Sequence, residues 1–197
     1  LVLPAYNEET HIKKNIEAFL KTNVFDEIIV VDNNSTDNTK NEIQKTSVKY
    51  FKETTQGYGA ALRKGMEEST CDYIVLCEPD STFNSNDFFK FLSYIDDFEC
   101  IFGTRTTKSL IQKGAKMQFY LRVGNIAVAK ILEYLYFGPT LSDVGCTYKM
   151  ISRSSYEKIK NNLRVAGSEF QPELMIQLIL NKVRILEIPV NYLEREG

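Results

Sequence analysis

Residues 27–37 read EIIVVDNNSTD, and this stretch decides the fold class. Its first part, 27–31, is apolar without alternation, which is typical of a parallel strand buried on both faces. Its second part, 32–37, is polar and ends in Ser35-Thr-Asp37, residue types that often open a helix. A buried strand, a polar loop and a helix in succession indicate one unit of an α/β sheet.

The same unit recurs along the first half of the chain. Apolar residues at helical spacing predict a helix over 9–21, with Thr10 as a candidate N-cap. Strands are predicted at 1–3, 48–51, 72–77 and 100–102, and further helices at 59–68 and 88–95. This alternation predicts an α/β fold with a mostly parallel central sheet and helices on both faces, a Rossmann-like three-layer sandwich. No repeat or linker interrupts the chain, so we expect one domain over residues 1–197.

The second half follows a different pattern. Residues 117–137 predict a mostly apolar helix that carries Arg122, Lys130 and Glu133. Those charges argue against a membrane span and leave two alternatives, a helix packed on the sheet or one lying in a membrane interface. A strand-like segment at 143–151, a helix at 172–180 and a strand at 183–189 complete the prediction.

Composition excludes several classes of function. The 197 residues contain 24 Lys and Arg against 26 Asp and Glu, without the basic cluster typical of nucleic-acid binding. Four cysteines without a CxxC pair, and the single histidine His11, exclude a Cys/His zinc site. We interpret the cysteines as reduced thiols and expect a cytoplasmic location. The cytoplasmic face of a membrane is the alternative location. The chain begins inside a strand-like run, so we expect a domain trimmed at both ends, with flanking membrane segments outside it.

Acidic residues follow three of the predicted strands. Glu8 lies in the loop after the first strand, Asp32 ends the second, and Glu78-Pro-Asp80 follows the strand at 72–77. The carboxyl ends of parallel strands meet at one edge, where such sheets bind ligands. Oxygen ligands without His or Cys favour Mg²⁺ or Mn²⁺, which often bridge one or two carboxylates to a diphosphate.

Each acid also has a simpler interpretation. For Ser35 and Asp37, a helix cap or a turn is the better explanation. For Glu78 and Asp80 it is the worse one, because two acids around a proline directly after a buried strand repel each other unless a cation lies between them. The sequence therefore predicts a metal site formed by Asp80 and Glu78.

Several runs occur in an order that resembles a known family: LVLPAYNEE, IIVVDNNSTDNT, GYGAALRKGM, CEPDSTF, the GTR at 103–105, and EIPVNYLERE. The chain resembles family 2 glycosyltransferases of the GT-A fold, most closely the dolichol-phosphate mannose synthase-like and polyprenyl-phosphate glycosyltransferase branch. The resemblance covers nearly the whole chain. It implies an inverting enzyme that takes a sugar from a UDP- or GDP-sugar with the help of a divalent metal.

The resemblance also implies residue roles. Asp80 would be the metal-diphosphate ligand of a DxD-like motif; the first acid is Glu78 rather than Asp, which puts its direct coordination in doubt, and Thr82 stands where Gln is frequent. Asp32 would bind the base or ribose. The other residues expected in the donor site are Pro4, Tyr6, Glu8, Asn34, Gly57 and Lys64.

Phosphate charge requires cations. By the same resemblance, Arg105 and Arg195 match positions associated with phosphate groups, and Arg122 is the candidate contact for an acceptor phosphate; a salt bridge is the simpler interpretation for each. Asp143 is the best candidate for a general base, with Glu173 behind it. A hydroxyl acceptor requires such a base, whereas with a phosphate acceptor Asp143 would only hold its loop.

The arginines and the apolar helix lead us to expect a lipid phosphate acceptor. A hydroxyl acceptor on a polysaccharide or glycolipid is the alternative, and a non-catalytic nucleotide-sugar-binding module is the alternative from another class. A Rossmann dehydrogenase is disfavoured because Leu62 stands where the third glycine of its fingerprint belongs. A sugar-nucleotide pyrophosphorylase would need a Gly-rich first loop that bears an arginine. The sequence does not predict the sugar, the base or the oligomeric state.

Overall fold

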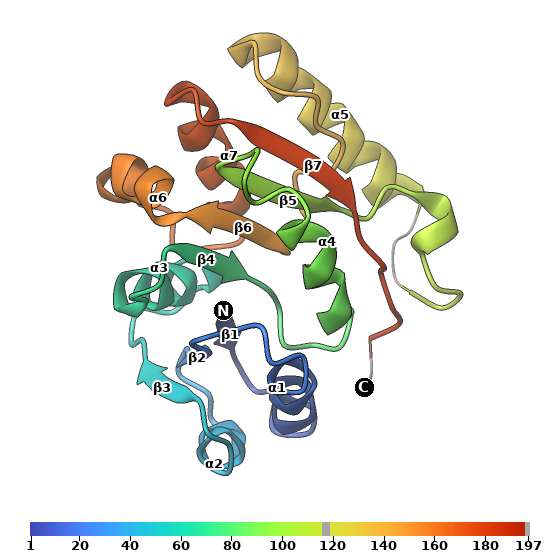
Figure 1. The fold of residues 1–197 in the computed structure, drawn as a ribbon. Helices are drawn as coiled ribbons and strands as arrows, with labels where there is room; N and C mark the ends of the chain where they lie inside the picture. The colour runs from blue at the N-terminus through green and yellow to red at the C-terminus, as the bar shows by residue number, and fades with distance from the viewer. Residues whose placement is uncertain (116–118, 196–197) are drawn as a thin grey trace.

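A single seven-stranded sheet forms the centre of the molecule (Figure 1), in the strand order β3-β2-β1-β4-β6-β5-β7. The structure is a computed structural model that describes residues 1–115 and 119–195. The strands are β1 (Val2–Ala5), β2 (Ile29–Asp32), β3 (Lys49–Lys52), β4 (Tyr73–Leu76), β5 (Cys100–Thr104), β6 (Lys149–Ser152) and β7 (Ile185–Pro189). The short strands β1, β2, β5 and β6 are buried along their whole length.

Six of the seven strands run in one direction, which confirms the prediction of a mostly parallel sheet. The strand β1 pairs in parallel with β2 and β4, and β5 pairs in parallel with β7. Only β6 is reversed, because it is antiparallel to both β4 and β5. The chain approaches β6 from the edge where β5 ends, since Ser142 and Asp143 bond to residues 104 and 105, and it therefore enters the sheet in the opposite direction.

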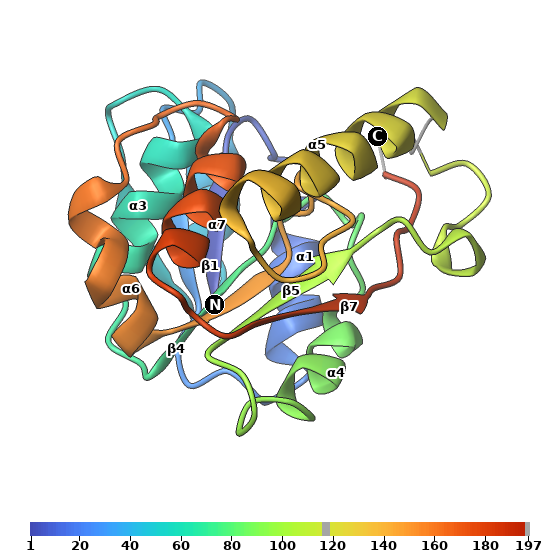
Figure 2. The same ribbon diagram turned by 90° about the horizontal axis from the view of Figure 1, so that it is seen from above.

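Helices cover both faces of the sheet and give the predicted three layers (Figure 2). One core cluster contains side chains of α3 (Tyr58–Glu68), α5 (Phe119–Tyr136), α6 (Arg153–Ile159) and α7 (Phe170–Leu180). The other contains side chains of α1 (Ile12–Leu20), α2 (Thr39–Gln44) and α4 (Phe88–Leu92). Three short 3-10 helices lie at Ser85–Asp87, Lys108–Leu110 and Lys160–Asn162.

Several predicted boundaries were wrong. Thr10 is not the cap of α1, because His11 occupies the N-cap position and makes no side-chain cap bond. The helix expected from Ser35–Asp37 begins at Thr39, since the Asp37 carboxylate forms a turn with the Thr39 backbone and hydroxyl. The helix at 88–95 ends at Leu92, and the strand predicted from residue 143 begins at Lys149. The helix α6 was not predicted, although the Ser152 hydroxyl caps it by accepting the Ser155 N–H.

The helix α5 stands out because it leaves most of its apolar side chains exposed. Residues 117 and 118 of the predicted helix lie outside the described residues. Among the apolar side chains of α5, Ala129 and Leu132 are buried in the core, whereas Tyr134 is 80% exposed and Phe137, just past the helix, is 95% exposed. Within the described parts of the chain, no helix combines the length and the hydropathy that crossing a membrane requires.

The packing of α3 on the sheet depends on a glycine. A Cβ at Gly65 would lie 2.3 Å from Val2 Cγ1 and 3.1 Å from Val31 Cγ2, so β1 and β2 would have to move. We predict that Gly65→Ala lowers the free energy of unfolding by about 1–3 kcal/mol through overpacking. The matched control is Gly124→Ala in α5, where a Cβ meets nothing within 4 Å; it should raise stability by about 0.5–1 kcal/mol. Urea unfolding of both variants checks this, and equal effects would contradict it.

Candidate active site

Two adjoining cavities lie where β1, β2 and β4 end. Pro4, Tyr6 and Tyr58 line both of them. The first cavity, of about 170 Å³, is completed by Ala5, Asn33, Gln56 and Ala61. The second, of about 190 Å³, is completed by Glu8, Glu78, Pro79, Asp80 and Arg195. We call the second one the acidic pocket. The structure therefore brings Glu8, which follows β1, and Glu78 and Asp80, which follow β4, together at the carboxyl edge of the sheet.

The Asp80 side chain is held by the loop that carries it. Its Oδ1 accepts the Thr82 hydroxyl at 2.6 Å and the Thr82 N–H at 3.1 Å. Ser81 between them has a positive φ of 63°, a conformation that costs energy for a residue other than glycine. Asn15 of α1 supports the loop by donating to the Pro79 carbonyl at 2.6 Å and accepting the Ser81 hydroxyl at 2.8 Å. Thr82 and Asn15 thus fix the direction of the Asp80 carboxylate.

The acidic pocket holds more negative than positive charge. Burial raises the pKa of Glu78 to about 7, the charge of Asp80 adds to that rise, and Arg105 and Arg195 oppose it. Burial also raises the pKa of Glu8, and Arg195 opposes this by donating to Glu8 Oε1 at 2.8 Å. Arg195 Nε lies 4.0 Å from Asp80 Oδ2. One arginine therefore faces three carboxylates in a partly buried site.

The neighbouring cavity is uncharged and mostly apolar, with the amides of Asn33 and Gln56 among its lining side chains. Asn33 is buried and binds the carbonyls of Glu53 and Thr55 and the N–H of Gly57, so it fixes the segment 53–57 against β2. Asn33, Gln56 and Tyr58 were not among the predicted site residues, although all three lie in or beside the quoted runs. Their position in the sequence, next to Asp32 and Gly57, was the signal that could have identified them as site residues.

Asp32 and Asn34 lie at the end of β2 but do not line the cavities. Asp32 accepts the Ser35 N–H at Oδ1 and the Tyr50 hydroxyl at Oδ2, both at 3.0 Å. Asn34 has a φ of 61° and donates to the Thr54 carbonyl at 2.8 Å. Both side chains are engaged in shaping the loops that surround the uncharged cavity.

Gly57 and Lys64 differ from their predicted roles. Gly57 has a φ of 143°, and a Cβ there would lie 2.2 Å from the Ala166 carbonyl oxygen, so the close approach is to the protein's own backbone. Lys64 forms an ion pair with Glu68 at 2.6 Å on α3, and it lines neither cavity.

Arg105 and Asp143 form one unit beside the acidic pocket. Arg105 Nε donates to Asp143 Oδ2 at 2.9 Å and Nη2 donates to Oδ1 at 3.0 Å, and the Arg105 backbone N–H also donates to Oδ2. The guanidinium lies over the Tyr192 ring, 5.2 Å from its centroid. Asp143 is fully buried and both of its oxygens are occupied, which suits the alternative in which it holds a loop rather than the role of a base.

The other two predicted catalytic residues lie outside both cavities. Glu173 is on the first turn of α7, where its carboxylate accepts the backbone N–H groups of Arg164 and Val165 at 3.0 Å. Glu173, the second candidate for a base, is thus engaged in holding the backbone of residues 164–165. Arg122 is partly buried on α5.

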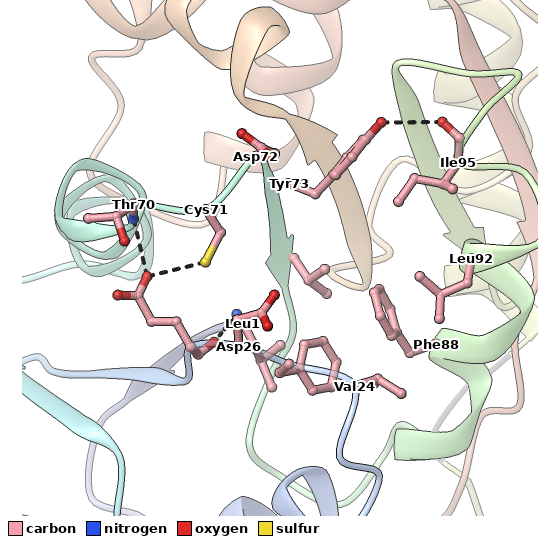
Figure 3. A pocket seen from close by; sticks show the side chains of 13 residues that line it. Leu1, Val24, Asp26, Thr70, Cys71, Asp72, Tyr73, Phe88, Leu92 and Ile95 are labelled. Atoms are coloured by element: carbon pink, nitrogen blue, oxygen red, sulfur yellow. Dashed lines mark hydrogen bonds between the residues drawn. The ribbon is translucent and has the colours of Figure 1, made fainter.

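A larger cavity of about 440 Å³ lies at the opposite edge of the sheet (Figure 3), around Leu1, Cys71 and Tyr73. These residues stand at the amino ends of β1 and β4, whereas ligands of such sheets bind beyond the carboxyl ends. Of its three acids, Asp26, Glu27 and Asp72, the buried Glu27 accepts the Thr70 N–H. Size alone therefore does not identify the active site.

The donor set of the acidic pocket fits Mg²⁺ or Mn²⁺. It offers carboxylate oxygens with uncompensated negative charge, and these cations often use one or two carboxylates together with phosphate oxygens and water. Within residues 1–115 and 119–195, no three His, Cys, Asp or Glu side chains are grouped closely enough to hold a metal ion by themselves.

An α/β sheet with an acidic pocket at its carboxyl edge is suited to bind a cation together with a phosphate-bearing ligand. The family model described as "Glycosyl transferase family 2" matches residues 1–160. The chain belongs to this family, as the sequence runs suggested.

Similar proteins with curated names include three transferases. The low-salt glycan biosynthesis hexosyltransferase Agl6 of Haloferax volcanii is 27% identical and is matched over 100% of this chain and 48% of its own length. The dolichyl-phosphate beta-glucosyltransferase of Saccharomyces cerevisiae is 26% identical, over 100% of this chain and 67% of its own. The dolichyl-phosphate hexose transferase of Haloferax volcanii is 28% identical, over 100% and 83%. The chain thus spans about half the length of the first of these relatives.

Solved structures support the fold. The glucosyl-3-phosphoglycerate synthase from Mycobacterium tuberculosis, in complex with Mn²⁺, UDP and phosphoglyceric acid, has a TM-score of 0.76 and 17% identity. The similarity covers 100% of this chain and 69% of that one. At this identity it establishes a shared architecture and no more.

Lys149 is a charged residue in the core that our sequence analysis did not single out. It is fully buried on β6, donates to the Cys146 carbonyl and lies 5.2 Å from the centroid of the Phe102 ring. Burial lowers its pKa from 10.5 to about 8. The folded chain therefore releases this proton at a lower pH than the unfolded chain does.

This lowered pKa predicts a pH dependence of stability. Between pH 8 and 10.5 the unfolded state binds more protons at Lys149 than the folded state, so the folded state gains stability as the pH rises. Relative to Lys149→Met, the wild type should gain roughly 1 kcal/mol per pH unit in this window. Urea unfolding of both proteins at several pH values measures the difference, and a difference that stays constant or falls would contradict it.

Proposed function

We propose that this chain transfers a sugar from a nucleoside diphosphate sugar to a polyprenyl or dolichyl phosphate, with inversion at the sugar. The observation that carries the proposal is the acidic pocket beside an uncharged cavity, at the edge where α/β sheets bind ligands. The names of the dolichyl-phosphate transferases among the similar proteins support the acceptor class.

The two cavities would bind different parts of the donor. The base and ribose would lie in the cavity lined by Asn33, Gln56 and Tyr58, and the diphosphate would lie towards Glu78 and Asp80. A Mg²⁺ or Mn²⁺ ion bound there would neutralise the charge that develops on the leaving diphosphate. Asp80 is the better ligand of the pair, because Thr82 and Asn15 hold its loop in one direction.

Arginines supply the rest of the positive charge. Arg195 faces Glu8 and Asp80 directly, so it lies where a diphosphate would enter the pocket. Arg105 is oriented by Asp143 and Tyr192, and it needs no rearrangement to act on a phosphate group. Fixed charges of this kind stabilise a transition state more than mobile ones do.

The acceptor determines whether a base is needed. A lipid phosphate attacks as an anion, so no proton must be removed, whereas a hydroxyl acceptor requires a carboxylate within hydrogen-bond reach. The alternative with Asp143 as that base is disfavoured because Arg105 occupies both oxygens. This favours the phosphate acceptor.

A lipid acceptor also accounts for α5. The helix exposes Tyr120, Leu121, Ile131, Tyr134 and Leu135, in a region where a water-soluble domain would bury such side chains. Tyrosine is enriched at membrane interfaces, and an apolar helix face can lie in the headgroup region without crossing the bilayer. Arg122 on the same helix would then lie near the lipid phosphate.

The metal assignment predicts the behaviour of Asp80→Asn. With Mn²⁺, this variant should lose on the order of 100-fold or more in turnover and bind UDP- or GDP-sugars more weakly, because the pocket loses its best-oriented metal ligand. The control Asp26→Asn changes an exposed acid at the opposite edge of the sheet and should keep normal activity. A radiolabelled sugar assay with a short polyprenyl phosphate measures both. Normal turnover of Asp80→Asn would refute the metal site. A wild-type chain that binds the donor but transfers no sugar would favour the non-catalytic module.

The membrane assignment of α5 predicts vesicle binding. Replacing Tyr134 and Phe137 by Ser should lower the partition of the chain onto phospholipid vesicles by about tenfold, since both side chains would leave the apolar region. A matched double variant, Phe89→Ser with Tyr94→Ser, removes one exposed aromatic on α4 and one just after it, and it should bind as the wild type does. Co-sedimentation measures the partition, and equal losses in both double variants would contradict the assignment.

A further inference from the structure

Glu187 of β7 makes three hydrogen bonds to one loop. Its Oε1 accepts the backbone N–H groups of Ser142 and Asp143, each at 3.0 Å. Its Oε2 accepts the Ser142 hydroxyl at 2.5 Å. A carboxylate that receives two consecutive backbone N–H groups fixes the position of that backbone, and here the second residue is Asp143.

The Ser142 hydroxyl extends this network to the loop that carries Arg105. It lies 2.8 Å from the Thr104 hydroxyl and 2.9 Å from the Thr106 hydroxyl, which flank Arg105 in the chain. The two loops are joined a second time by the ion pair between Arg105 and Asp143. Glu187 therefore holds both the partner of Arg105 and, through Ser142, the backbone on either side of it.

The same network connects to the acidic pocket. Arg105 lies over Tyr192, which pairs with Phe83 through an isolated bridge. The next residue, Leu193, donates its N–H to the Thr82 carbonyl at 2.8 Å. The guanidinium is thus fixed relative to the segment that orients Asp80, and a shift of the 142–143 loop would change the distance between Arg105 and the pocket.

Charge balance explains why a carboxylate can occupy this place. Lys149 is fully buried in the same region, and the cluster formed by Arg105, Lys149, Asp143 and Glu187 has two positive and two negative groups. Buried charges are tolerated when they are paired and hydrogen-bonded. Without Glu187, the cluster would keep one excess positive charge and two backbone N–H groups would lose their acceptor.

We propose that Glu187 is a positioning residue of the transfer reaction, which holds Asp143 against Arg105 and thereby keeps the guanidinium beside the acidic pocket. The inference rests on the proposed function, in which Arg105 neutralises phosphate charge. Glu187 does not contact the pocket itself and acts only through Arg105.

A double-mutant cycle tests this inference. In the wild-type background, Glu187→Ala should lower kcat/KM for sugar transfer by about tenfold or more, because a small misplacement of a charged group is costly. In the Arg105→Ala background, the same change should lower it by less than about twofold, since the residue through which it acts is gone. A merely structural defect would lower activity by the same factor in both backgrounds.

Two further variants keep the test valid if Glu187→Ala does not fold. Glu187→Gln retains an oxygen that can accept both N–H groups, so it should recover most of the lost activity. Ser142→Ala removes only the hydroxyl link, and it should lose about threefold in the wild type and nothing further with Arg105→Ala. The control Glu99→Ala removes a carboxylate that bonds Lys158 and the Arg184 N–H at the other end of β5, and its effect should be the same in both backgrounds.

Each outcome has a distinct meaning. Equal factors for the Glu187 or Ser142 variants in the two backgrounds overturn the inference while the proposed function stands. A wild-type chain that transfers no sugar to a polyprenyl phosphate overturns the proposed function and this inference with it. Normal activity of folded Glu187→Ala also overturns the inference.

Discussion

The repulsion among carboxylates at one edge of the sheet is the constraint on which the rest of the site depends. The parallel strands β1 and β4 end side by side, and the loops that follow them bring Glu8, Glu78 and Asp80 into one cavity. Burial and the charge of Asp80 raise the pKa of Glu78 to about 7, so the site is strained electrostatically as the folded chain holds it. A group of acids in this state is stabilised by binding a cation, and a cation in turn attracts a diphosphate.

The surrounding structure keeps these acids in place with uncharged groups. Asn15 clamps the 79–81 loop, Thr82 bonds Asp80, and Asn33 fixes the segment that closes the uncharged cavity. Amides and hydroxyls can orient a carboxylate without neutralising it, whereas a lysine in the same place would cancel the charge that a metal needs. The loop sequences place few cationic side chains in the pocket, and its negative charge is therefore kept.

Much of this arrangement could be predicted from the sequence, and the parts that could not have a common cause. The apolar run before Asp32 and the acids after the strand at 72–77 are local patterns, so they predicted the sheet and the acidic pocket. The reversed strand β6 depends on where the chain re-enters the sheet, which no local pattern records. Asp143 and Glu173 are acids that could act as a base. Their partners, Arg105 and the backbone of residues 164–165, could not be predicted, because the first is distant in sequence and the second lies in a loop. Residue type predicts what a side chain can do, and tertiary contacts decide whether it is free to do it.

The molecule thus contains two groups of charges with opposite properties. The acidic pocket is a cavity with an excess of negative charge, so a bound cation would stabilise it. The cluster around Arg105 and Lys149 is balanced internally; Asp143 and Lys149 are fully buried, and Arg105 and Glu187 are partly buried. A self-neutral buried cluster is rigid, and rigidity is what a phosphate-binding arginine requires if it is to stabilise a charge that exists only in the transition state. In the proposed function, the first group would provide affinity for the donor, and the second would provide the fixed geometry against which the donor reacts.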